Sequence, residues 1–121
     1  MKKLVYLASF ALMFPCRAFS SGQDSLKEIA RHDSTRIVDV RTPEEFESGH
    51  IERSVNIPLD VISEHAEQLK PYAHVIVVCR SGRRSAQAKK ILEDMGFNVY
   101  DGGGWEAVEK MLQDAEDNIQ D

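Results

Sequence analysis

Residues 74–96 constrain the possible folds of this chain most strongly. They open with 74–78 (HVIVV), an apolar and largely β-branched run that is typical of a buried strand. Residues 86–95 have the composition of a helix, and Gly96 follows them as a helix-ending residue. The seven residues between the two elements, 79–85 (CRSGRRS), therefore connect the end of a buried strand to the start of a helix.

The same alternation of strands and helices extends along the chain. Further short apolar strands are predicted at 36–40, 54–57 and 97–100. Four such strands, joined by helical crossovers, predict an α/β fold. Its core would be a small parallel β-sheet flanked by helices on both faces.

The remaining helices are predicted from capping residues and from the spacing of apolar side chains. The strongest start signal is Thr42, which is followed by Pro43 and two glutamates. The segment 101–104 (DGGG) is expected to form a flexible turn before the last helix. The four helices predicted in this way cover 24–32, 42–49, 60–69 and 105–119.

Three segments are predicted to meet at one edge of the sheet. Cys79 directly follows one strand, Arg41 follows another, and residues 101–104 follow a third. Ligand sites in open parallel sheets lie beyond the carboxyl ends of the strands. We therefore expect a functional site at this edge.

The chemistry of the 79–85 loop suits a reactive thiolate. Its backbone N–H groups can turn inward around the Cys79 sulfur, and the following helix directs its positive end to the same place. Arg80, Arg83 and Arg84 add positive charge, which stabilises a thiolate and attracts an anion. Cys79 is thus the predicted catalytic nucleophile. The residues expected to bind substrate are Arg80, Ser81, Gly82, Arg83, Arg84 and Ser85, and an alternative role for Arg84 is to hold the loop.

The same residues also have simpler explanations. A cysteine at the end of a valine-rich strand is often a small buried hydrophobic residue, and arginines in a loop are often only a solvated surface. Here the cysteine, a glycine, three arginines and a helix start fall within one turn, and this coincidence favours a site. Two residues are expected to support it: Asp39 as a loop-anchoring acceptor, and Arg41 in an ion pair with Glu44 or Glu45.

The composition argues against several classes of function. The 121 residues carry a net charge of −5, which disfavours nucleic acid and anionic membranes as partners. The two cysteines, Cys16 and Cys79, form no disulfide framework, and no Cys/His cluster has the spacing of a metal site. The length suits one domain, and we expect a monomer.

Residues 1–20 have the pattern of a secretory signal peptide. A short basic start precedes the apolar run 4–14, and 18–20 (AFS) supplies small residues for a cleavage site after Ser20. Cleavage would leave residues 21–121 as one domain in the periplasm, without stable membrane association. That domain has 12 basic and 20 acidic residues, a net charge of −8. The alternatives are an uncleaved membrane anchor and a lipoprotein modified at Cys16.

Several short motifs occur in a fixed order along the chain. They are Asp39-Val40-Arg41, Glu45-Phe46, Gly49-His50-Ile51, Asn56-Ile57-Pro58, Cys79–Ser85, Gly102-Gly103 and Trp105. This ordered set resembles the single-domain rhodaneses. The resemblance spans about residues 24–112, and with the leader the chain is similar to small exported members of that family. One departure is Ser54, where the family often has alanine.

The resemblance implies a rhodanese-like domain with sulfurtransferase activity. Cys79 would carry a persulfide, surrounded by the backbone amides of residues 79–84. Family members take sulfur from thiosulfate or another sulfane-sulfur donor and pass it to cyanide or a thiol. The implied partners are therefore a small anionic sulfur donor and a thiol or cyanide acceptor. No metal or organic cofactor is implied.

Other functions are left open by the sequence. A cysteine-dependent phosphatase also uses a thiolate in an arginine-bearing loop. Its pattern resembles Cys-x5-Arg, whereas only four residues separate Cys79 from Arg84. A second alternative is a persulfide carrier or a non-enzymatic rhodanese-like interaction module, although such modules often lack the cysteine.

The leader generates a first testable prediction. We expect the mature protein to begin near Ser21, because the apolar run and the small residues before it match a cleaved export signal. N-terminal sequencing of the protein from a periplasmic extract checks this. Protein that retains Met1 and remains in the cytosol would contradict it.

Overall fold

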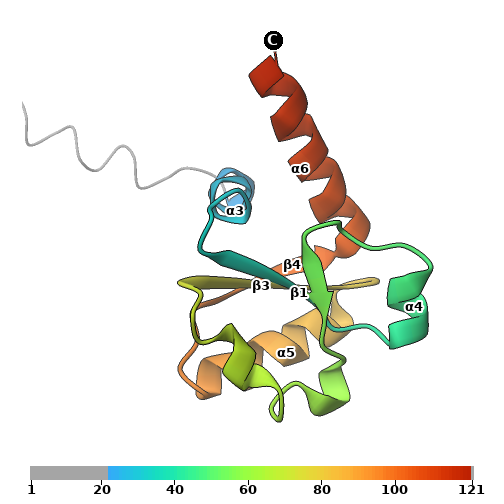
Figure 1. The fold of residues 1–121 in the computed structure, drawn as a ribbon, viewed down its shortest axis with the longest axis vertical. Coiled ribbons are helices and arrows are strands. Elements are labelled where there is room, and N and C mark those ends of the chain that lie inside the picture. The colour runs from blue at the N-terminus through green and yellow to red at the C-terminus, as the bar shows by residue number, and fades with distance from the viewer. Residues whose placement is uncertain (1–21, 121) are drawn as a thin grey trace, which may run out of the picture.

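The centre of the molecule is a sheet of four parallel strands. The computed structural model describes residues 22–120, so the predicted leader at 1–20 lies outside the described residues. The predicted α/β class with a parallel sheet is confirmed (Figure 1). Along the sheet the order is β2-β1-β3-β4, with β1 at Thr35–Asp39, β2 at Ser54–Asn56, β3 at His74–Cys79 and β4 at Val99–Gly104.

Helices cover both faces of this sheet. Figure 1 shows α3 (Gly22–Ala30) and α6 (Trp105–Gln120) on one face and α5 (Arg83–Asp94) on the other. The short helix α4 (Pro43–Glu47) lies beside the sheet, near the carboxyl ends of the strands. None of the helices within residues 22–120 has both the length and the apolar character needed to cross a bilayer.

The central strand β3 divides its side chains between two cores. Val75, Val77 and Cys79 belong to the core under α5, whereas Ile76 and Val78 belong to the core under α3 and α6. All five are buried, as the continuous apolar run of this strand predicts. Cys79 therefore leaves the strand on the α5 face, directly below the first turn of that helix.

Helix α5 begins and ends at glycines with left-handed backbone. Its N-cap is Gly82, with φ 99°, so the helix starts two residues ahead of Ser85. At the other end, Gly96 has φ 98° and donates its N–H to the carbonyl of Glu93 at 2.9 Å. Phe97 donates to the carbonyl of Leu92 at 3.0 Å, which completes a Schellman ending. The prediction that Gly96 stops this helix is confirmed.

The helix predicted at 60–69 is wrong. Two 3-10 segments replace it, η2 at Leu59–Val61 and η3 at Ala66–Leu69. The neighbouring β-branched residues Val61 and Ile62 are poor helix formers, and tight turns with three-residue hydrogen bonds connect the two segments. The apolar spacing was informative about burial, because Ile62, Ala66 and Leu69 all face the core.

The flexible turn predicted at 101–104 is also wrong. These residues extend β4 alongside β3, so that Gly104 pairs with Cys79 after an irregularity in register between Val77 and Val78. A Cβ on Gly102 would lie 2.9 Å from Cγ1 of Val78 and 3.1 Å from Cγ2 of Val108. The glycine is needed for the close approach of strand and helix rather than for flexibility.

This close approach makes Gly102 a test of the packing. We expect Gly102→Ala to lower the free energy of unfolding by about 1–3 kcal/mol, because the added methyl group would lie too close to the side chains of Val78 and Val108. Thermal or urea unfolding measures the loss.

The matched comparison uses Val78→Ala, which removes the nearest clashing atom. The double variant should lose less stability than the sum of the two single variants. Additive losses would show that the methyl group of Gly102→Ala does not contact Val78.

Candidate functional site

Cys79 lies at the carboxyl end of β3, beneath the start of α5. Its side chain is buried, with 1% of the residue exposed, and packs in the same core as Val40 and Val77. The loop over it leads through Gly82 into the first turn of the helix. The sulfur thus lies on the floor of a loop made by its own neighbours in the sequence.

Two backbone N–H groups donate hydrogen bonds to this sulfur. The N–H of Gly82 lies 3.0 Å from Cys79 Sγ, and the N–H of Ser85 lies 3.3 Å from it. The first N–H groups of a helix have no partner within the helix, so the sulfur satisfies a donor that would otherwise need water or a side chain. The left-handed backbone of Gly82 is what turns the loop inward at this point.

Opposing influences set the pKa of the Cys79 thiol. Burial, the largest of them, raises the pKa because it disfavours the charged form. The Ser85 hydroxyl and the N–H groups of Ser85, Gly82 and Ser81 lower it, and together they prevail, so that the pKa lies below its ordinary value. The site therefore favours the thiolate, the form of cysteine that acts as a nucleophile.

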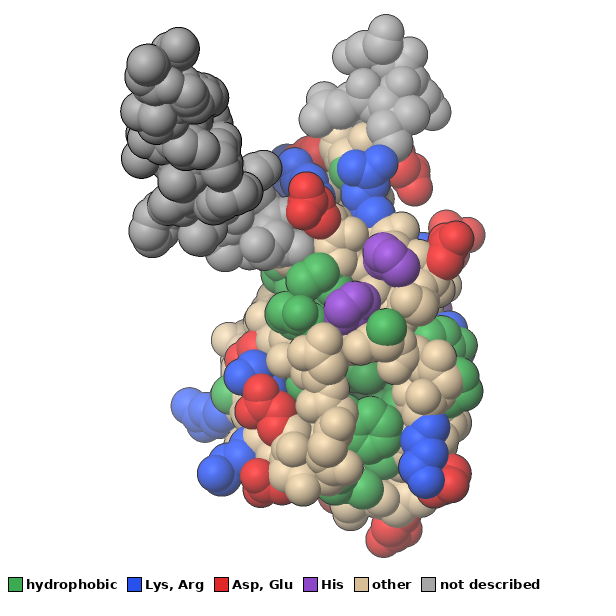
Figure 2. All heavy atoms as spheres, turned by 90° about the vertical axis from the view of Figure 1, so that its left-hand side faces the viewer, with side chains coloured by type: hydrophobic (Ala, Val, Ile, Leu, Met, Phe, Trp, Pro, Cys, Tyr) green, Lys and Arg blue, Asp and Glu red, His purple; other side chains and the backbone are tan. Residues whose placement is uncertain are grey.

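Three of the four histidines have partners of their own in the structure. His32 and His74 lie at the opposite edge of the sheet, before β1 and at the start of β3, with ring centroids 5.8 Å apart. Figure 2 shows histidine side chains together on that surface. His50 stacks on Phe46 of α4 at 3.7 Å, and its Nδ1 lies 2.7 Å from the Phe46 carbonyl oxygen. The groups that lower the pKa of the Cys79 thiol are hydrogen-bond donors of its own loop.

Asp39 and Arg41 form a buried ion pair beside the loop. Arg41 donates from Nε and Nη2 to the Asp39 carboxylate at distances down to 2.7 Å, and its backbone N–H donates to the same carboxylate. The two side chains are 5% and 0% exposed. Asp39 thus accepts hydrogen bonds from both the backbone and the side chain of Arg41. The predicted pairing of Arg41 with Glu44 or Glu45 is wrong, because the nearer buried carboxylate takes the guanidinium.

Further contacts hold Arg41 on its other sides. Its Nη2 donates to the carbonyl of Gly49 at 2.7 Å, and its guanidinium carbon lies 4.8 Å from the ring centre of Trp105. Asn56, which the sequence analysis did not assign to the site, donates to the carbonyls of Asp39 and Arg41, both at 3.0 Å. The pairing of Asn56 with Asp39 across β1 and β2 places it there, and the order of strands was not readable from the sequence.

Glu45 forms its ion pair with Arg84 rather than with Arg41. Arg84 donates to both carboxylate oxygens of Glu45, at 2.8 and 3.1 Å, across 39 positions of sequence. The Arg84 hydrogen bond, followed by donation from the Thr42 backbone, lowers the pKa of Glu45 from 4.5 to about 2. Because the pKa of Glu45 is lowered in the folded protein, its ion pair with Arg84 contributes fully to the stability of the fold above pH 4.5. This contribution is lost as the pH falls towards 2. The pair ties α4 to the first turn of α5.

Arg80 and Arg83 differ from Arg84 in their exposure. Both side chains are exposed to solvent, as is Ser81, whereas Arg84 is only partly exposed. Among residues 22–120, neither Arg80 nor Arg83 forms an ion pair. These two guanidinium groups are therefore free to meet an anion that approaches the loop.

Asp101 joins the site from β4. The hydroxyl of Ser85, a fully buried residue, donates to Asp101 Oδ1 at 2.7 Å, and the N–H of Gly103 donates to the same oxygen at 2.9 Å. The sequence analysis placed residues 101–104 at this edge of the sheet but gave Asp101 no role, because it assigned the segment to a flexible turn. The signal that could have revealed it is an acidic residue placed directly before the glycines.

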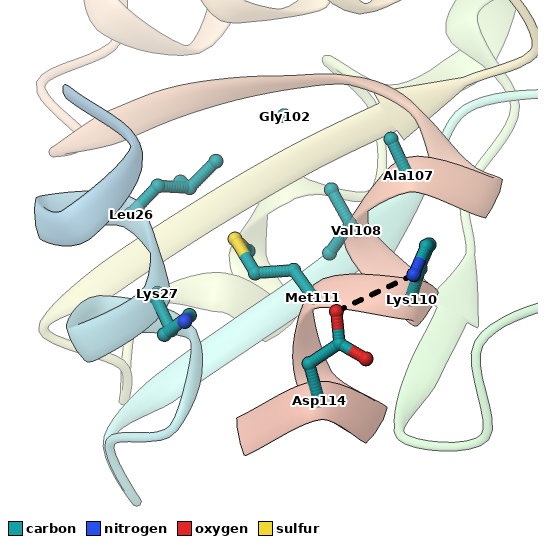
Figure 3. Close-up of a pocket in the computed structure, with 8 residues that line it drawn as sticks. All are labelled: Leu26, Lys27, Gly102, Ala107, Val108, Lys110, Met111 and Asp114. Carbon is teal, nitrogen blue, oxygen red and sulfur yellow. Dashed lines mark ion pairs between the residues drawn. The ribbon is translucent and has the colours of Figure 1, made fainter. Parts of the chain in front are cut away.

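The surface of the described residues has several hollows, and one of them borders the loop. A cleft of about 280 Å³ adjoins the loop, with Arg41 and Arg84 in its lining together with Val40 and Leu59. A hollow of about 400 Å³ lies between α3 and α6 (Figure 3), where the ion pair Lys110–Asp114 borders apolar side chains. Neither lining includes Cys79, so the hydrogen bonds to the sulfur, and not the hollows, identify the loop as the candidate site. Within the described residues, no group of three or more His, Cys, Asp or Glu side chains is arranged to hold a metal ion.

Comparisons with known sequences agree on one family. The family described as "Rhodanese-like domain" matches residues 22–111. Thiosulfate sulfurtransferase PspE of Escherichia coli is 38% identical over 69 residues, which are 55% of this chain and 66% of PspE. YrkF of Bacillus subtilis, described as a candidate sulfur carrier protein, is 35% identical over 59% of this chain and 38% of its own length. The chain thus spans less than two thirds of either relative.

Solved structures show the same fold. A rhodanese from Escherichia coli, solved with anions, is 37% identical and has a TM-score of 0.55 over 60% of this chain and 88% of its own. A rhodanese-like domain protein from Staphylococcus aureus is 33% identical, with a TM-score of 0.60 over 70% of this chain and 85% of its own. A parallel sheet with Cys79 beneath the first turn of a helix, together with these matches, identifies the chain as a member of the rhodanese-like family of sulfurtransferases.

Proposed function

We propose that this protein moves sulfane sulfur from thiosulfate, or a similar anionic donor, to cyanide or a thiol through a persulfide on Cys79. The observation that carries the proposal is the Cys79 sulfur on the floor of its loop, held by N–H groups of Gly82 and Ser85. Those donors stabilise a thiolate before the reaction and an anionic persulfide after it.

The proposed reaction has two steps. The Cys79 thiolate attacks the outer sulfur of thiosulfate, a bond forms between the two sulfurs, and the sulfur–sulfur bond of thiosulfate breaks with its electron pair leaving on sulfite. The acceptor, as cyanide or a thiolate, then attacks the outer sulfur of the persulfide. Thiocyanate or a new persulfide leaves, and the Cys79 thiolate is restored. No external oxidant or reductant takes part.

The arginines divide between structure and substrate in this proposal. Arg84 is bound by Glu45 and keeps the loop in place, which is the alternative role that the sequence analysis gave it. Arg80 and Arg83 are exposed at the loop and offset the repulsion between a thiolate and a dianion. The commitment of Arg84 to Glu45 also disfavours a phosphatase, because a phosphate ligand would have to displace that carboxylate.

A persulfide carrier is the second candidate function. It is favoured by the similarity to YrkF, and it requires the same Cys79 persulfide. The two functions differ in turnover: an enzyme passes sulfur to a small acceptor repeatedly, whereas a carrier holds it until a protein partner arrives.

We also propose that residues 21–121 form the working domain after export to the periplasm. The support is the leader pattern of residues 1–20 and the family match that begins at residue 22. Loss of the leader removes Cys16, so that Cys79 would be the only thiol in the mature protein. An internal disulfide could not then compete with persulfide formation.

The nucleophile is tested by Cys79→Ser. We expect thiosulfate:cyanide transfer to be abolished while the fold survives, because serine is nearly the same size but forms no persulfide. Intact-mass measurement after incubation with thiosulfate should show one added sulfur on the parent protein and none on the variant. Transfer activity retained by a folded Cys79→Ser variant would refute the assignment.

The exposed arginines give the next prediction. We expect Arg80→Gln or Arg83→Gln to lower kcat/KM for thiosulfate by about tenfold to a hundredfold, because a charge-assisted contact to the anion is lost. Alkylation of Cys79 by a neutral reagent should change much less. An effect that shrinks at high salt indicates attraction at a distance, and one that persists indicates direct contact.

The control for total charge is Arg31→Gln, at an exposed arginine before β1. This substitution removes one positive charge, as the loop variants do, but at a position far from the loop in the sequence. It should leave kcat/KM for thiosulfate nearly unchanged. If the rates of sulfur transfer and of alkylation fall equally in the loop variants, these arginines tune the thiolate or support the loop. The proposal that they bind the anion would then be wrong.

A further inference from the structure

The loop over Cys79 lies against the end of β4 where the loop begins. Cys79 pairs with Gly104 in the sheet, so this glycine stands beside the first loop residue, Arg80. A Cβ on Gly104 would lie 3.0 Å from the carbonyl oxygen of Arg80 and 3.9 Å from its carbonyl carbon. The Arg80 carbonyl is therefore directed at Gly104, into the space that a side chain would occupy.

The middle of the loop approaches β4 as well. A Cβ on Gly82 would lie 3.8 Å from the Cα atom of Gly103, which is an ordinary van der Waals distance. Gly82 donates the shorter of the two backbone hydrogen bonds to the Cys79 sulfur, at 3.0 Å. The backbone of β4 thus approaches both the start of the loop and the residue that binds the sulfur.

A β-bulge in β4 brings Gly104 to this position. The pairing with β3 shifts in register so that Gly102 is an extra residue, and Cys79 stands opposite Gly104 rather than Gly103. Bulges bend a strand and change the residue that faces its partner, and they are frequent beside active sites. Here the bulge places a residue without a side chain opposite the proposed nucleophile.

Asp101 holds the bulge in shape. Its Oδ1 accepts hydrogen bonds from the N–H of Gly103 at 2.9 Å and from the hydroxyl of Ser85 at 2.7 Å. Gly103 has φ 75°, a left-handed conformation that favours glycine. Ser85 in turn donates its backbone N–H to the Cys79 sulfur at 3.3 Å. Hydrogen bonds therefore join the bulge to the first turn of α5.

We propose that Gly104 is a positioning residue for sulfur transfer, which admits the Arg80 carbonyl and thereby keeps the loop close over the Cys79 sulfur. The inference rests on the proposed role of Cys79 as the nucleophile. A methyl group at Gly104 would force the Arg80 carbonyl to move by a few tenths of an ångström. Gly82 follows two residues later in the same short loop, so its N–H would move with the carbonyl.

Such a displacement would change the reactivity of the thiol. A hydrogen bond weakens when its length or angle departs from the optimum, and a weaker donor stabilises the thiolate less. The pKa of the Cys79 thiol would then rise. Below that pKa fewer molecules carry the thiolate, so attack on thiosulfate would slow, whereas well above it nearly all thiols are ionised in either protein.

Replacement of Gly104 by alanine changes no charge near the sulfur. A shift in the pKa of Cys79 in this variant would therefore report the geometry of the loop and not a lost or added ion. The charged groups around the loop are Arg80, Arg83 and Arg84 on the loop and α5, Glu45 on α4, the pair Asp39–Arg41 after β1, and Asp101 on β4.

The experiment measures the pH dependence of alkylation of Cys79 by iodoacetamide, which is neutral. We expect Gly104→Ala to raise the midpoint of this dependence by roughly half a pH unit to one unit, because one hydrogen bond to the thiolate is weakened. The value of kcat/KM for thiosulfate should fall about threefold to tenfold below the midpoint, and by less above it.

The matched control is Gly96→Ala, at the opposite end of α5. Gly96 has φ 98°, so alanine strains the backbone there, and among the described residues no heavy atom lies within 4 Å of the added Cβ. We expect this variant to melt at a lower temperature while the alkylation midpoint stays unchanged. The control separates a loss of stability in α5 from a displacement of the loop.

A second pair of variants tests the same frame without adding a methyl group. Asp101→Asn and Asp101→Ala remove the same negative charge, but only asparagine retains an oxygen that can accept from Gly103 and Ser85. We expect the alkylation midpoint of Asp101→Ala to lie above that of Asp101→Asn, because the bulge loosens in the alanine variant. This pair decides the question if thermal melting shows that Gly104→Ala does not fold.

The outcomes are distinct. An unchanged or lowered midpoint in folded Gly104→Ala, or an equal rise in Gly96→Ala, overturns the proposal, as do equal midpoints for the two Asp101 variants. The readout is alkylation of Cys79 rather than sulfur transfer. If the midpoints shift as expected but the parent protein takes up no sulfur from thiosulfate, the proposed function alone is refuted.

Discussion

The hydrogen bonds from the start of α5 to the sulfur of Cys79 are the contacts on which the rest of the site depends. They join a strand end and a helix start through one atom, since the sulfur that ends β3 accepts the N–H groups of Gly82 and Ser85. The same contacts satisfy unpaired donors of the helix and stabilise the charged form of the thiol. Stability of the helix terminus and reactivity of the sulfur are thus linked, and neither can be altered without the other.

Two ion pairs fix the segments around the Cys79 loop. One pair is buried and the other is partly exposed. Asp39 and Arg41 are almost fully buried, so that removal of one partner would leave an uncompensated charge in the core. Glu45 and Arg84 are about one-third exposed, and their value lies in geometry more than in energy. The first pair fixes the segment after β1, while the second fixes α4 against α5. Together they close two sides of the loop.

Structural features that depend on local sequence patterns were predicted correctly from the sequence. Features that depend on packing between distant segments were not. The apolar run of β3, the capping box at Thr42 and the stop at Gly96 are local, and all three are present. The partners of Arg41 and Arg84 depend on which strands and helices are neighbours, which periodicity does not reveal. Residues 101–104 were misjudged for the same reason, because their glycines respond to the side chains of β3 and α6 rather than to local backbone freedom. Asp101 was placed at the predicted edge of the sheet with them but was given no role there.

The distribution of charge around the loop follows from these partners. Of the arginines that the sequence places at the site, Arg41 and Arg84 are bound by carboxylates, which leaves Arg80 and Arg83 in solvent. A chain with a net charge of −5 repels anions at long range, and salt screens that repulsion beyond about 10 Å. Attraction therefore has to come from charges at the loop itself. A short loop suits this requirement, because Arg80 and Arg83 follow Cys79 by one and four residues and cannot move far from it. Arg80 and Arg83 therefore supply the positive charge that the loop presents to solvent, while Arg41 and Arg84 hold its surroundings in place.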